Sequence, residues 1–143
     1  RPLHALSRRQ RQMCIRDSNI IEATIISMEK IGASRKNIIA VIGPTIQKQS
    51  YEIKDDVAKI VKQSLSFKRN NSILSQMNNN KYLFDLPLLL KESLKISKIN
   101  KIGDININTY DNNLFFSHRY SSHQNSSKAG MTGRHISVIG ILK

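Results

Sequence analysis

Phe115-Phe116-Ser117-His118-Arg119-Tyr120 is the run around which the rest of the chain is organised, and it is followed by a polar segment and then by Thr132-Gly133-Arg134-His135. Two aromatic residues precede a hydroxyl, an imidazole and a guanidinium group. Arg offers a planar fork of donors suited to phosphate or carboxylate, and Ser and His add a donor and a proton carrier. The residues alone leave two interpretations open: an anion-binding site, or a solvated hairpin loop with its Arg side chains on the surface.

The segment that begins at Asn19 has a helical pattern. Apolar residues recur at helical spacing, at Ile21, Ile25 and Met28. Asn19 and Glu22 are placed as a capping-box pair, and Gly32 marks the end of the helix. The continuous apolar run 38–42 then predicts a strand buried on both faces. A helix followed by a buried strand indicates an α/β layer arrangement.

Gly43-Pro44 ends the apolar run, and the pair either lets the backbone approach a ligand closely or only punctuates the chain. Tyr51 lies next to a second predicted helix, which extends to residue 65. Its ring either stacks on a base or sugar or belongs to the core. Residues 67–80 are rich in Asn, Ser and Lys and predict a mobile surface loop.

A third helix is predicted after Asp85, which is placed as its cap, with Pro87 in the first turn. Its buried stripe is expected to consist of Leu86, Leu89, Leu90 and Leu94. Gly103 is expected to close the connection to a half-exposed strand at 104–109, and segment 136–142 is predicted as a final strand.

Three blocks of sequence, in this order along the chain, resemble the laccase-domain family, also called polyphenol oxidase-like, purine nucleoside phosphorylase-like or peptidoglycan editing factor. The first comprises 28–34, 39–46 and 51–53, the second is 81–86, and the third is 115–119 with 132–134. The resemblance implies an α/β fold of layered sheets flanked by helices, α/β/β/α. Residues 19–143 are then expected to be the C-terminal part of a single laccase-like domain that is truncated at its N-terminus.

The activity that the resemblance implies is phosphorolysis of purine nucleosides, with adenosine deamination by a zinc-bound water as a companion. Purine nucleoside and phosphate are the implied partners. Editing of a peptidoglycan precursor by hydrolysis is the alternative within the family.

The resemblance also implies the site residues. Arg119 is expected to hold phosphate or another substrate anion, with Ser117 and His118 as nearby donors and His118 as the candidate catalytic residue. Arg134, Gly43 and Tyr51 complete the expected substrate-binding set. Tyr120 stands where the family commonly has a second Arg.

Zinc is the expected cofactor, because family members are understood to hold it with two His and one Cys that lie upstream of Asn19. No metal ligand is therefore assigned in this chain, and little or no activity is expected of it. His118 and His123 are five residues apart, but they lack the Cys partners of a zinc finger, and Cys14, the only cysteine, stands outside the family motif.

The net charge of +13 suits an anionic ligand or nucleic acid. A basic nucleic-acid-binding domain is the alternative from another class, but the chain shows no aromatic platform, helix-turn-helix or zinc finger, and its Lys residues are scattered. No run of 18 apolar residues and no secretory core segment occurs, so no membrane partner and a cytoplasmic location are expected. The oligomeric state is not indicated.

Segment 1–18 differs from the rest, because it holds five of the nine Arg residues. It has no counterpart in the family, and it is expected to be non-native or disordered and is excluded from the fold. A basic tail for nucleic acid or a membrane is the functional alternative.

Overall fold

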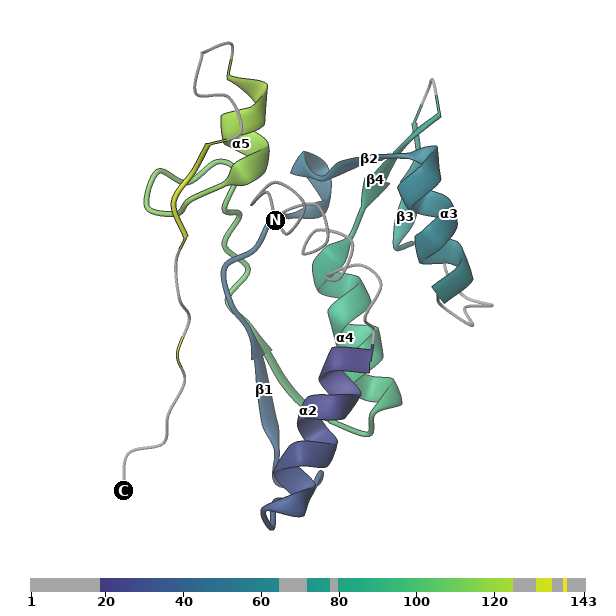
Figure 1. Ribbon diagram of the computed structural model, residues 1–143, viewed down its shortest axis with the longest axis vertical. Helices are drawn as coiled ribbons and strands as arrows, with labels where there is room; N and C mark the ends of the chain where they lie inside the picture. The colour runs from purple at the N-terminus through teal and green to yellow at the C-terminus, as the bar shows by residue number, and fades with distance from the viewer. Residues whose placement is uncertain (1–18, 65–71, 78–79, 125–130, 135–137, 139–143) are drawn as a thin grey trace, which may run out of the picture.

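The computed structural model of the chain describes residues 19–64, 72–77, 80–124, 131–134 and 138. Two small sheets with flanking helices make up the described part (Figure 1), and its class is therefore mixed α/β. The elements in chain order are α2 (Asn19–Lys30), β1 (Ile39–Ile42), η1 (Lys48–Ser50), β2 (Glu52–Lys54), α3 (Asp55–Ser64), β3 (Leu74–Gln76), β4 (Lys81–Phe84), α4 (Leu86–Ile96), β5 (Lys101–Asp104) and α5 (His118–His123).

The first sheet consists of β1 and β5, which pair in parallel from Ile39 opposite Lys101 to Ile42 opposite Asp104. Backbone pairing continues beyond the strand ends: Ile105 N–H donates to the Ile42 carbonyl at 3.0 Å, and Thr109 N–H donates to the Thr45 carbonyl at 3.2 Å. These bonds hold the segment that leads from β5 to α5 against the segment that leaves β1. The carboxyl ends of both strands therefore point toward the candidate site.

The face of β1 that turns toward α2 and α4 is covered, and the other is not. Ile25, Ile38 and Ile99 form a buried cluster, with Ala40 packed against it. Ile39 and Val41, which alternate with Ala40 along the strand, remain 56% and 43% exposed. The prediction of a strand buried on both faces is therefore wrong for the described residues, because an apolar run by itself does not say whether a second layer is present.

The second sheet has the strand order β2-β4-β3, with both pairs antiparallel. Helix α3 packs on it, and the fully buried side chains of this core include Phe84, Ile73 and Val61. Burying a Phe or Ile side chain contributes about 1.5–3 kcal/mol, so this cluster is the main source of stability in this half.

Strand β3 corrects the loop predicted at 67–80. Ile73 and Leu74 are buried there. Leu74 pairs with Phe84 of β4, and the Ile73 carbonyl accepts a hydrogen bond from Asp85 N–H at 2.8 Å. The loop was predicted because most residues in 67–80 are Asn, Ser or Lys, and this polar composition gives no sign of the two core residues. Residues 65–71, 78 and 79 lie outside the described part.

Helix α4 begins as predicted. The Asp85 side chain accepts a hydrogen bond from Leu88 N–H at 2.9 Å, and Pro87 lies in the first turn, where its missing N–H leaves no donor unpaired. The expected Leu stripe is half-buried and not fully buried.

Three further expectations of the sequence are corrected. The strand before the signature segment is Lys101–Asp104 and not 104–109, and Gly103 lies inside it, beside Val41. Glu22 does not act in a capping box, because its carboxylate pairs with Arg35 at 2.6 Å. Helix α2 does end near Gly32, which has a positive φ of 98° that favours glycine. Segment 1–18 and all of segment 136–142 except Val138 lie outside the described residues.

No helix among the described residues is both long and apolar enough to span a membrane.

Candidate functional site

Ser117 starts the element that carries the signature. Its side chain accepts a hydrogen bond from Tyr120 N–H at 3.2 Å, and its carbonyl accepts one from Ser121 N–H at 3.0 Å. Both bonds are typical of an N-cap Ser. The run from His118 to His123 is consequently a helix, α5, and the surface-loop interpretation of this run is wrong. Six residues are too few for a helical period to appear in the sequence.

Arg119 projects from α5 onto Tyr51, and its guanidinium carbon lies 5.5 Å from the centroid of the Tyr51 ring. The Tyr51 ring is itself fixed by Phe84, at 5.3 Å between centroids, and its carbonyl accepts a hydrogen bond from Phe84 N–H at 2.9 Å. Two residues assigned to the site from the sequence thus meet, although they are 68 positions apart in the chain. The interpretation of Tyr51 as a core residue is confirmed, because it packs against the core cluster of the second sheet. Stacking of Tyr51 on a base or sugar stays a prediction.

Arg119 and Arg35 have different surroundings. Within the described part of the chain, no Asp or Glu pairs with half-buried Arg119. Arg35 holds Glu22 at 2.6 Å and Glu29 at 2.9 Å. Its hydrogen bonds are the main reason that the pKa values of both carboxyl groups lie below their ordinary range. Arg119 therefore has donors to offer to an anion, whereas Arg35 is a structural residue.

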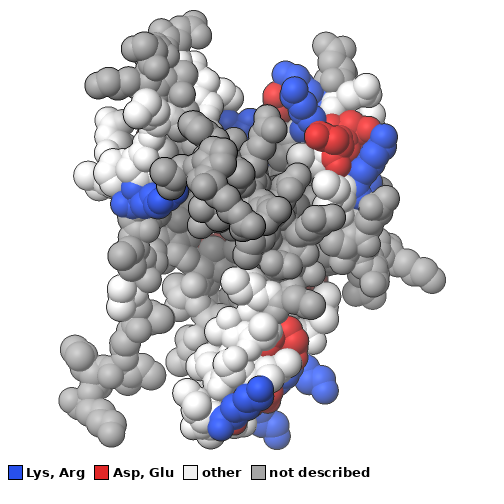
Figure 2. All heavy atoms as spheres, in the orientation of Figure 1, with Lys and Arg blue, Asp and Glu red and all other residues white. Residues whose placement is uncertain are grey.

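Acidic residues accompany many of the basic ones elsewhere. Figure 2 shows Lys and Arg interleaved with Asp and Glu in two places on the face in view. Lys59 pairs with Asp55 on α3, and Lys81 pairs with Glu52 across the second sheet. This interleaving does not resemble the continuous basic track of a nucleic-acid interface.

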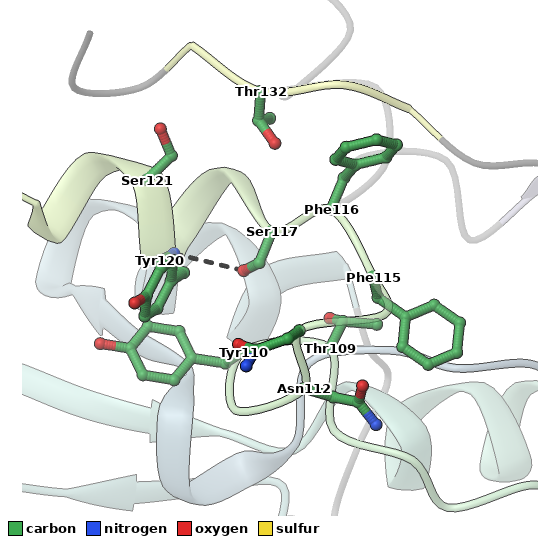
Figure 3. A pocket seen from close by; sticks show the side chains of 10 residues that line it. Thr109, Tyr110, Asn112, Phe115, Phe116, Ser117, Tyr120, Ser121 and Thr132 are labelled. Carbon is green, nitrogen blue, oxygen red and sulfur yellow. Dashed lines mark hydrogen bonds between the residues drawn. The ribbon is translucent and has the colours of Figure 1, made fainter.

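A pocket of about 210 Å³ lies beside α5 (Figure 3). Four aromatic residues contribute to its lining, namely Tyr110, Phe115, Phe116 and Tyr120. Hydroxyl groups come from Thr109, Ser117, Ser121 and Thr132, and amides from Asn112 and Asn113. None of these lining residues carries a charge.

The pocket and Arg119 occupy different faces of α5. Ser121 lines the pocket, and at 100° per residue Arg119 lies about 200° around the helix from it, so the two side chains point to nearly opposite sides. Of the sequence-assigned residues, only Ser117 borders the pocket; Tyr51 and Arg119 form a second group. The single compact site expected from adjacent residues is therefore divided in two.

The remaining assigned residues, His118, Arg134 and Gly43, do not line the pocket. His118 is exposed, and its Nδ1 lies 3.1 Å from the Ser122 hydroxyl. Arg134 is exposed and forms no ion pair with a described residue. Gly43 directly follows β1 and is half-buried.

Asn108 is a positioning residue that the sequence did not reveal. Its Oδ1 accepts hydrogen bonds from Gln47 N–H at 3.2 Å and from Tyr110 N–H at 3.1 Å. Its amide nitrogen donates to Ser50 Oγ at 2.9 Å and to Asp111. One side chain thus joins the segment before Tyr51 to the segment before α5. Nothing in the alternation of residues 104–109 distinguishes Asn108 from Asn106.

A metal site is not assembled by the described residues. Among them, no group of three or more His, Cys, Asp or Glu side chains comes together that could hold an ion. His123 instead bonds Tyr110: its Nδ1 lies 2.9 Å from the Tyr110 hydroxyl. Cys14 lies outside the described part. These residues do not fit the two-His, one-Cys zinc set of the family.

Comparison with known proteins adds a family, two curated relatives and a solved structure. A family model described as multi-copper polyphenol oxidoreductase laccase matches residues 16–142. A purine nucleoside phosphorylase of Rickettsia prowazekii (strain Madrid E) is 39% identical over 97 residues, which cover 66% of this chain and 38% of that protein. One of Rickettsia conorii (strain ATCC VR-613 / Malish 7) is 38% identical over 109 residues, which cover 74% of this chain and 43% of that protein.

The crystal structure of a hypothetical protein of Bacillus licheniformis, YfiH, superposes with a TM-score of 0.62 at 22% identity. The match covers 72% of this chain and 38% of that one, and it shows that the fold is shared. The chain spans about two fifths of the length of the curated relatives that it matches.

Proposed function

The chain belongs to the family described as multi-copper polyphenol oxidoreductase laccase, and from that premise we propose that it carries the phosphate-binding side of a purine nucleoside phosphorylase site. The observation on which this depends is the position of Arg119, which lies over Tyr51 and pairs with no described carboxylate. The names of both curated relatives support purine nucleoside and phosphate as the substrates.

In phosphorolysis a phosphate oxygen forms a bond to the anomeric carbon of the sugar while the bond from that carbon to the purine nitrogen breaks. The nitrogen keeps the electron pair and takes up a proton, which gives a purine base and ribose 1-phosphate. Phosphate must be held beside the anomeric carbon, and a fixed guanidinium group does this without reorganisation during the reaction. We assign this role to Arg119.

His118 is proposed as the proton carrier. The contact of its Nδ1 with the Ser122 hydroxyl restricts which ring nitrogen is available for proton transfer. Arg134 and Gly43 are proposed as further substrate contacts, on the resemblance alone.

Adenosine deamination and zinc dependence are proposed at the level of the family. Zinc, where bound, would lower the pKa of a water molecule. Since the described residues assemble no zinc set, no step of the proposal is assigned to the metal here, and we expect the purified chain to release little base.

The test is to incubate the purified chain with inosine and phosphate, with and without zinc, and to follow hypoxanthine and ribose 1-phosphate by chromatography. Phosphate binding with little turnover is the expected result. Robust base release that depends on Arg119 would refute the expected inactivity but support the phosphorylase assignment. Hydrolysis of a peptidoglycan precursor, with neither phosphate binding nor base release, would replace this function with the editing alternative.

A further inference from the structure

One face of the first sheet has no covering layer among the described residues. Helices α2 and α4 lie on one side of β1 (Figure 1), and the apolar cluster around Ile25 covers the sheet there. On the opposite face, the side chains of Ile39 and Val41 are exposed. Parallel sheets occur almost only with both faces covered. This face of β1 and β5 is therefore a surface that suits a further layer.

The exposed face, which we call the bare face, consists of Ile39 and Val41 of β1 with Gly103 of β5. An added Cβ at Gly103 would lie 3.5 Å from a methyl carbon of Val41, so the two positions adjoin. Because Gly103 has no side chain, β5 leaves Val41 uncovered. The charged residue in register with this face is Lys101, which pairs with Ile39 at the start of the sheet.

The outer edge of β1 differs from the other open strand edges of the described part. β1 pairs with β5 alone, and its sequence, Ile-Ala-Val-Ile, carries no charge. The other three edge strands carry charged or amide side chains, namely Lys101 and Asp104 on β5, Glu52 and Lys54 on β2, and Gln76 on β3. Charged side chains on an edge strand discourage pairing with a further strand. The edge of β1 lacks this protection and is open to pairing.

The lengths of the relatives indicate what covers this surface. The match covers 38% to 43% of the two curated relatives and of the YfiH chain, so more than half of each lies outside it. In a compact fold, layers bury their apolar faces against one another. The remaining part of such a protein therefore needs an apolar surface on the matched part, and the bare face with the β1 edge provides one.

A second copy of the chain fits this surface less well. Each copy carries a net charge of +13, and like charges of this size oppose association. Strand β1 also offers only four residues for pairing, whereas a stable interface involves about 20–30 residues a side. A larger partner that reaches both the face and the edge is not limited in this way.

We propose that the bare face and the outer edge of β1 dock a polypeptide that carries the part of the laccase-like fold outside this chain's match. The partner adds a strand to the β1 edge through backbone hydrogen bonds and covers Ile39 and Val41 with apolar side chains. The proposal goes beyond the phosphate site, and its test needs neither phosphate nor nucleoside, so either proposal can fail without the other.

The probe is the part of the Rickettsia prowazekii phosphorylase outside the match, tagged and co-expressed with the full, untagged chain. We expect the chain to co-purify with the probe in equal amounts and the β1 amides to exchange hydrogen at least about tenfold more slowly in the complex. Ile39→Lys and Val41→Lys place a charge in the contact and reduce co-purification at least about tenfold. Ile96→Lys, at an exposed position on α4, is the matched control and co-purifies as the wild type does.

Circular dichroism checks the fold of each variant, and Ile39→Lys, at the more exposed position, decides the test if Val41→Lys unfolds. A probe that is soluble only with the chain supports the proposal. A probe that stays insoluble or free of the chain overturns it, and so does equal co-purification of Ile39→Lys and Ile96→Lys. Wild-type dimers in sedimentation equilibrium that Ile39→Lys abolishes would assign the surface to a second copy instead. A monomer whose β1 amides exchange slowly without the probe would assign it to the predicted strand 136–142.

Discussion

The guanidinium group of Arg119 lies over the ring of Tyr51, with 5.5 Å from the guanidinium carbon to the ring centroid. One residue comes from the C-terminal signature and the other from the turn before β2. Tyr51 in turn packs on Phe84, which is fully buried in the core of the second sheet. The candidate anion-binding arginine therefore contacts, through two rings, the buried core of the second sheet.

Removal of the Tyr51 ring is predicted to weaken phosphate binding without removing a charge. Both partners are half-buried, and a cation–π contact is worth about 0.5 kcal/mol when exposed and about 2 kcal/mol when desolvated, so Tyr51→Leu is expected to reduce phosphate affinity about two- to thirtyfold. Tyr51→Phe keeps the ring and serves as the control, with wild-type affinity expected by calorimetry. Equal losses in both variants would show that the hydroxyl group matters and the ring does not.

The four hydrogen bonds of Asn108 predict a large loss of stability when its amide is removed. Asn108→Ala leaves the Gln47 and Tyr110 N–H groups without their acceptor, and we expect the free energy of unfolding to fall by roughly 2 kcal/mol in urea titrations. Asn100→Ala, at an exposed position, is the control and should change the free energy by less than about 0.5 kcal/mol. A similar small change in Asn108→Ala would mean that water replaces its partners.

A side chain at Gly133 is predicted to displace the Phe116 ring. An added Cβ would meet three atoms of the Phe116 ring at 2.7–2.8 Å, closer than van der Waals contact allows. In Gly133→Ala, we expect the Phe116 ring resonances to shift. Gly103→Ala is the matched control, because its Cβ would lie at an ordinary 3.5 Å from Val41. Unchanged Phe116 resonances in Gly133→Ala would contradict the close packing.

The Arg35 ion pairs predict a loss of stability in acid. Hydrogen bonds from Arg35 lower the folded-state pKa of Glu22 and Glu29 below the ordinary Glu value of about 4.3. Their stabilisation is therefore complete above about pH 5 and is lost as the pH falls through the lowered folded-state values. The pKa of Arg35 is raised by the same bonds, so Arg35 stays charged throughout.

Urea titrations between pH 6 and pH 2 measure this effect. Arg35→Gln should show a shallower dependence of the unfolding free energy on pH than the wild type. The unfolding free energy of Arg35→Gln should still depend on pH, because a hydrogen bond from Lys91 also lowers the pKa of Asp104. Arg119→Gln, which removes an arginine that pairs with no described carboxylate, should retain the wild-type slope. Identical slopes in Arg35→Gln and the wild type would contradict the assignment of these pairs.

The sequence predicts helices better than it predicts strands in this chain. The Asp85 cap and the Gly32 stop act within a few residues, so α4 begins and α2 ends where local chemistry places them. Strands β3 and β5 depend on partners 6 to 62 positions away, and neither the polar composition of 67–80 nor the alternation of 104–109 carries that information. The exposure of Ile39 and Val41 likewise depends on which layers cover the sheet.

For the site, the family motif identified Arg119, Ser117 and Tyr51 but could not show their arrangement. The pairing of Arg119 with Tyr51 depends on tertiary structure, and so does the separation of Ser117 from Arg119 by the turn of a short helix. Asn108 was missed because its role comes from four partners on two segments. All six assignments, namely Ser117, His118, Arg119, Arg134, Gly43 and Tyr51, stay predictions.

Phosphate binding by the wild type and by Arg119→Ala, followed by ³¹P NMR at constant ionic strength, tests the central claim most directly. Charge-assisted hydrogen bonds are worth about 1.5–3 kcal/mol, so the account predicts a loss of affinity of at least about tenfold in Arg119→Ala and none in Arg35→Gln. Equal phosphate affinity in the wild type and Arg119→Ala, or no phosphate binding by the wild type, would contradict it.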